Sequence, residues 1–142
     1  MLLHRLLLSV GLSVDRSHPI KPTIDFLRRL EEASTSVVAA VGALGVGNER
    51  LLLVEYEAVK SVFASALPDA LFRSFLTANI AEDDEHSLIA EQVAARLVSL
   101  GASVEEYRRG AEAGVTARLR YYDELSAFYE TDGLPSSWMA DS

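Results

Sequence analysis

Residues 71–100 constrain the fold most, because polar side chains interrupt an otherwise apolar helical pattern there. Five apolar residues recur at steps that suit a buried helix face: Phe72, Leu76, Val93, Leu97 and Leu100. The intervening positions of the same face are Asn79, Asp83, His86 and Ala90. A carboxylate buried without a partner costs several kcal/mol unless it is paired, protonated or bound to a metal ion. The pattern therefore predicts a buried carboxylate that has a functional role.

The rest of the chain has helical periodicity and no convincing strand. We expect four principal helices, at about residues 23–44, 49–66, 71–100 and 103–130. Gly42, Gly45 and Gly47 are expected to end the first helix, and Asn48 to cap the second. Ser103 with Glu106 forms a capping box for the fourth. The predicted fold is an all-α, compact helical bundle in a single domain, 1–142, with an N-terminal apolar segment and loop (1–22) and a tail (131–142).

Composition narrows the possible partners and the environment. The chain has 142 residues, 49% of them apolar, which is enough for one packed core. Its net charge of −8 makes nucleic acid and anionic membrane surfaces poor partners. No cysteine is present, so disulfides and thiolate metal sites are excluded, and a cytoplasmic location is expected. Residues 1–14 resemble a weak signal peptide, but a core helix or a dimer contact is the simpler interpretation.

Asp83 and His86 are the strongest candidates for metal ligands. They are three residues apart, so they share one helix face and can bind the same ion. Glu55, on the inner stripe of the preceding helix, is the expected third ligand. Oxygen and imidazole donors suit iron or manganese. Two alternatives remain open: Glu82 with His86 in a shifted register, and an acidic turn that simply faces water.

Small and aromatic residues of the last helix could line a ligand pocket. Gly110 and Gly114 favour either close helix packing or space for a flat ligand. Arg118 could orient an acidic substrate group, with Tyr121 or Tyr122 lining the pocket, or it could pair with the acidic turn at 82–85. A further candidate for the pocket is Asn79, whose simpler role is a core amide bonded to backbone.

The segment NIAEDDEH resembles the third-helix signature of haem-oxygenase-like non-haem iron enzymes, His-x-x-x-Asp-x-x-His. Asp83 matches its aspartate, His86 matches its second histidine, and Asn79 stands in place of the first. The later GAEAGVTARLRYYDEL is similar to the last helix of that superfamily, with Arg118 and Asp123 as its polar ends. The resemblance covers residues 79–125. A rival resemblance links IAEDDEHSL to the carboxylate-x-x-His helices of ferritin-like and rubrerythrin-like proteins, in which two subunits would complete one site.

The haem-oxygenase-like resemblance implies a protein that binds a small organic molecule in the bundle and oxidises it with non-haem iron. Glu55, Asp83 and His86 would then hold the metal. The alternative from a different class is a non-catalytic helical module for dimerisation or protein binding. A ferritin-like metal-binding subunit is a further alternative. In each case we expect a homodimer.

Overall fold

The computed structural model describes residues 19–63 and 69–131, and within these ranges the regular structure is entirely helical. The elements are α2 (Lys21–Ala33), α3 (Val37–Ala40), η1 (Val41–Glu49), α4 (Arg50–Phe63), α5 (Asp69–Ser99) and α6 (Val104–Thr131). Because α3, η1 and α4 follow one another without a break, they form one long helix, and four helices pack together. This confirms the all-α bundle. The predicted N-terminal apolar segment and the tail after residue 131 lie outside the described residues.

The boundary between the first two helices differs from the prediction. Helix α2 ends at Ala33, and the Ser34 hydroxyl donates to the Leu30 carbonyl at 2.8 Å. Ser36 then caps α3, because its Oγ accepts from the Ala39 amide at 3.2 Å. The chain continues as a helix through Gly42, Gly45 and Gly47, which form the π-helical segment η1. The prediction that these glycines end a helix and that Asn48 caps the next was therefore wrong.

Glycines bring α6 together with α3 and η1, backbone to backbone. A Cβ added at Gly110 would overlap the backbone of Ala39, and one added at Gly114 would overlap that of Ala43. Gly47 faces α6 in the same way, since its Cβ would lie 2.8 Å from the Cα of Gly114. The two α6 glycines thus serve close helix packing. They leave no space for a flat ligand, which was the other alternative open from sequence.

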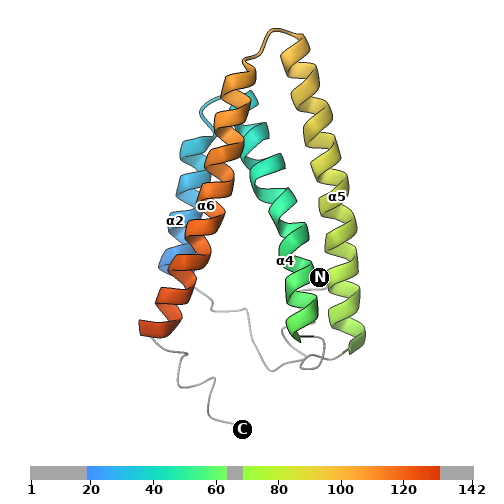
Figure 1. The fold of residues 1–142 in the computed structure, drawn as a ribbon, viewed down its shortest axis with the longest axis vertical. Coiled ribbons are helices and arrows are strands. Elements are labelled where there is room, and N and C mark those ends of the chain that lie inside the picture. The colour runs from blue at the N-terminus through green and yellow to red at the C-terminus, as the bar shows by residue number, and fades with distance from the viewer. Residues whose placement is uncertain (1–18, 64–68, 132–142) are drawn as a thin grey trace.

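The long central helix lies between α6 and α5 (Figure 1). Helix α6 packs along α3 and η1, and α2 lies against α6. On the other side α5 packs against η1 and α4. Figure 1 shows α5 and α6 meeting at the turn that joins them and diverging from there. Gly101, with φ of +96°, lies in that turn, which needs a left-handed backbone that glycine adopts without strain.

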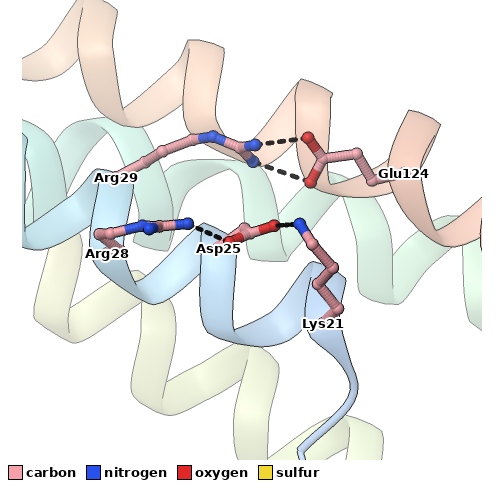
Figure 2. Close-up of polar contacts among 5 residues, drawn as sticks. All are labelled: Lys21, Asp25, Arg28, Arg29 and Glu124. Carbon is pink, nitrogen blue, oxygen red and sulfur yellow. Dashed lines mark hydrogen bonds and ion pairs between the residues drawn. The ribbon is translucent and has the colours of Figure 1, made fainter.

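Polar contacts hold α2 on α6. The Arg29 guanidinium forms a two-pronged ion pair with Glu124, with one N–O distance of 2.9 Å (Figure 2). On α2 itself, Asp25 lies between Lys21 and Arg28 and pairs with both. Hydrogen bonding from Arg29 lowers the pKa of Glu124, and that from Lys21 lowers the pKa of Asp25. These carboxylates therefore stay ionised down to lower pH than usual.

The buried strip of α5 follows a different spacing from the one predicted. Its buried side chains are Phe72, Leu76, Asp83, Ser87 and Ala94. They repeat every 11 residues, close to three turns of a straight α-helix. The predicted seam followed a shorter period, which drifts around a straight helix, so Val93 is 41% exposed. Leu100, the last residue of the predicted seam, lies in the turn after α5 and is 68% exposed. Asp83 lies on both patterns, and its predicted burial is correct.

Two further features bear on the predicted helices. Ser103 caps α6, since its Oγ accepts from the Glu106 amide at 3.2 Å, while the Glu106 carboxylate accepts from Ser36 at 3.1 Å.

The helix Val37–Ser61 is long and apolar enough to cross a membrane by length and composition. Core helices of globular proteins meet the same criterion, and this helix is packed between two others.

Candidate metal site

Glu49, Asp83 and His86 come together where η1 meets α5. Glu49 is the last residue of η1, and the other two lie in the middle of α5. One potential ligand atom from each lies within 4.8 Å of the others. Asp83 and His86 share a face, as their spacing predicted. The third member is Glu49 and not the predicted Glu55.

Burial at this group increases toward the helix interface. The His86 side chain is 59% exposed, and its Nδ1 lies 3.9 Å from Glu49 Oε2. Asp83 is 8% exposed, and its Oδ2 has no hydrogen-bond partner among the described residues. An ionised carboxylate in such a position calls for a cation or a proton.

The surroundings of Glu49 change its pKa. Burial, and then a hydrogen bond and charge repulsion from Asp83, raise the pKa of Glu49. Nearby His86 and Arg118 act in the opposite direction. Two carboxylates can share a hydrogen bond only when one of them is protonated. A divalent cation would replace that proton and satisfy both groups.

Glu55 is directed to a different partner. Its Oε1 lies 3.3 Å from Arg118 Nε, forming an ion pair between α4 and α6. Glu55 lies on the inner side of α4 as predicted, with 22% of its side chain exposed, but it meets α6 and not α5. The residue that meets Asp83 of α5 is Glu49, at the end of η1, and Glu55 is paired with a guanidinium.

Arg118 is the buried centre of a second polar network. Its Nη2 donates to Asn48 Oδ1 at 2.6 Å, and its guanidinium lies 4.8 Å from the centre of the Phe26 ring. With Glu55 as its ion partner, this guanidinium links α2, η1, α4 and α6. Of the two roles open from sequence, pairing is the one the structure shows, although the partner is Glu55 and not the acidic turn of α5.

The predicted pocket tyrosines lie at this network and outside the metal group. Tyr121 stacks on Phe26 with ring centres 4.9 Å apart, and its hydroxyl lies 3.4 Å from Thr23 Oγ1. Burial and a hydrogen bond to Glu55 raise the pKa of Tyr122. Tyr121 is therefore a packing residue between α2 and α6, and Tyr122 belongs with the Glu55–Arg118 pair.

Asn79 has the simpler of its two predicted roles, an amide that hydrogen-bonds to the backbone. Its amide nitrogen donates to the carbonyl of Phe75 at 2.7 Å, one turn back in α5. The side chain is half-buried and bonded to its own helix.

A surface hollow of about 450 Å³ lies between α2 and α6, lined by residues including Arg29, Arg109 and Arg120. None of the three candidate ligands lines it.

Sequence reasoning missed Glu49, Asn48 and Ser87. Glu49 and Asn48 were assigned to a helix start, where polar residues are common. Ser87 was absent from the predicted seam, although it lies 11 residues after the buried Leu76. Testing an 11-residue spacing beside the shorter one would have placed it on the buried strip.

Comparison with known proteins gives no match: no family model, no curated protein and no solved structure is significantly similar to this chain.

Proposed function

We propose that this protein binds one divalent transition-metal ion, iron or manganese, through Glu49, Asp83 and His86. Two observations carry the proposal together: one potential ligand atom from each residue lies within 4.8 Å of the others, and Asp83 Oδ2 is buried with no hydrogen-bond partner among the described residues. Exposed acidic clusters are common without a metal. In this group, however, the Asp83 oxygen has no hydrogen-bond partner among the described residues unless Glu49 is protonated, so a cation there would satisfy an oxygen that an ionised Glu49 leaves unpaired.

The donor set supports the choice of metal. Two carboxylates and one imidazole are hard or borderline ligands, which suit Fe²⁺ and Mn²⁺ better than soft ions. With three protein ligands, such an ion would keep positions open for water or a small molecule. An ion of this type supplies redox or Lewis-acid chemistry when bound. Oxidation of a small organic molecule, implied by the haem-oxygenase-like resemblance, stays a prediction.

Metal titration of the purified protein tests the proposal. We expect one Mn²⁺ or Fe²⁺ per chain, measured by equilibrium dialysis with elemental analysis. Asp83→Asn and Glu49→Gln should each remove most of this binding, because each replaces an anionic ligand with an amide. Glu82→Gln and Glu85→Gln are matched controls from the exposed face of the same helical turn. Binding that survives Asp83→Asn but not Glu82→Gln would contradict the assignment and support the shifted register.

A non-catalytic dimerisation module is the second candidate, and one observation favours it. Ile89 and Val93 lie on one side of α5 and Leu100 follows in the turn after it; they are 48%, 41% and 68% exposed. An exposed apolar stripe of this kind is typical of a surface that pairs with another helix. If it joins two copies of the chain, Val93→Glu should convert a dimer to a monomer in light scattering. A wild-type monomer at high concentration would contradict this candidate.

A further inference from the structure

The hydroxyl of Ser87 differs from several other hydroxyls in the described helices. Serine and threonine inside helices commonly donate to a carbonyl one turn back. Ser74 does so to Ala70 at 2.8 Å, and Thr116 to Glu112 at 2.7 Å. Ser87 is 1% exposed, and its Oγ has no hydrogen-bond partner within the part of the chain that the structure describes.

Ser87 follows Asp83 by one helical turn on the same buried strip of α5. Two neighbouring positions therefore each place an unpartnered polar atom at the interface: a carboxylate oxygen of Asp83 and the Ser87 hydroxyl. Leaving buried polar atoms without partners is costly, and native proteins rarely do so without a functional reason. A bound ion satisfies the Asp83 oxygen, but a serine hydroxyl is a weak direct ligand for Fe²⁺ or Mn²⁺.

We infer that the Ser87 hydroxyl holds a water ligand of the metal ion bound by Glu49, Asp83 and His86. This inference rests on the proposed function. An ion with three protein ligands carries water at its open positions, and a bound water is a strong hydrogen-bond donor. Ser87 Oγ is a buried acceptor without a partner among the described residues, one turn along α5 from Asp83, whereas the His86 side chain is 59% exposed. Ser87 is thus a positioning residue that fixes where an open coordination position points.

A purely structural role makes the opposite prediction for stability. If the hydroxyl instead turned to donate to Asp83 in the metal-free protein, removing it would destabilise that protein. If it waits for a metal-bound water, Ser87→Ala removes an unsatisfied polar atom, and the metal-free protein keeps or raises its melting temperature. The two roles therefore differ in the sign of one measurement.

The experiment compares Ser87→Ala with wild type, with Ser74→Ala as a matched control from the same helix. Three quantities are measured: the melting temperature without metal, the Kd for Mn²⁺, and the relaxation of solvent water protons by bound Mn²⁺. For Ser87→Ala we expect an unchanged or higher melting temperature and a Kd weakened about 10-fold, as for other residues that support a metal's ligands. The relaxation enhancement should fall because the water is held less often. Ser87→Thr keeps the hydroxyl and should recover much of the affinity.

The outcomes separate the two proposals. If wild type binds Mn²⁺ and Ser87→Ala changes neither its affinity nor the water relaxation, the role of Ser87 is overturned and the metal site stands. A metal-free Ser87→Ala protein that melts clearly lower, with affinity intact, assigns Ser87 to structure and also overturns it. If wild type binds no Mn²⁺ or Fe²⁺, the metal site itself is overturned, and the inference about Ser87 with it.

Discussion

At the scale of single residues, Arg118 shows how one buried cation organises several helices. The guanidinium donates to Asn48, pairs with Glu55 and lies over Phe26. A buried charge pair adds little net stability compared with an apolar pair, but removal of one partner leaves the other charge uncompensated. Loss of the Arg118 side chain should therefore lower the stability of the whole protein.

Replacing this guanidinium with an apolar side chain of similar length tests its role. We expect Arg118→Met to lower the free energy of unfolding by ~3 kcal/mol, because Glu55 and Asn48 lose their partner. Urea denaturation followed by circular dichroism measures the change. Arg120→Met, at an exposed position two residues later, is the control and should have little effect. Equal stability of the two variants would show that the network is not structural.

The pH dependence of the metal-free protein should report Glu49. Burial and Asp83 raise the pKa of Glu49 above its ordinary value of 4.5. Protonation therefore favours the folded state, and this contribution is present below pH 4.5 and is lost as pH rises through the raised pKa. In the presence of a chelator, the free energy of unfolding of wild type, relative to that of Glu49→Gln, should fall as pH rises through the raised pKa of Glu49. Saturating Mn²⁺ should abolish this fall. The same fall with and without Mn²⁺ would contradict the assignment of Glu49 to the metal site.

At the scale of elements, the contact between η1 and α6 depends on the absence of side chains. Alanine is ordinarily better than glycine inside a helix by about 1 kcal/mol. At Gly114 that gain is outweighed, because a Cβ would meet the backbone of Ala43. The same reasoning applies where α6 meets α3, at Gly110 against Ala39.

A glycine-to-alanine substitution makes this contact measurable. We expect Gly114→Ala to destabilise the protein by about 1–3 kcal/mol through overpacking, despite its better helix propensity. Thermal unfolding gives the change, and Thr116→Ala on the exposed face of the same helix controls for propensity. A stabilised Gly114→Ala protein would mean that the two helices can separate at little cost.

At the scale of the whole molecule, α5 is held to the rest by its contacts with η1 and α4. An ion pair between Arg50 and Glu91 supports this side, and the candidate metal site lies in the same interface. Helix α6 is held differently, by glycine-mediated packing on η1 and by α2. Metal binding should therefore act on one side of the molecule.

Hydrogen exchange with and without Mn²⁺ tests this asymmetry. We expect slower amide exchange in α5 and η1 and little change in α2. Mn²⁺ at 100 times its Kd should add roughly 2.7 kcal/mol to the free energy of unfolding. The Asp83→Asn variant should show neither effect. Uniform protection of all helices would indicate global stabilisation without a preference for the α5 interface.

Periodicity within single helices allowed much of this structure to be predicted. The all-α fold, the cap at Ser103, the burial of Asp83 and the shared face of Asp83 and His86 depend on neighbours along one helix. Local spacing and capping chemistry encode such features directly. Within α5 the only error was the period, and the straight 11-residue strip moved Ser87 inward and Val93 outward.

Sequence patterns were enough to predict an all-α fold and a buried carboxylate in α5, although not the boundary between the first two helices. Only the tertiary structure decided which residues meet that carboxylate. Glu49, the last residue of η1, reaches Asp83, while Glu55 pairs with Arg118, and the glycines of α6 allow η1 to approach closely. The physical reason is that a contact between helices depends on how closely their backbones approach and how far each is rotated, and packing of distant segments fixes both.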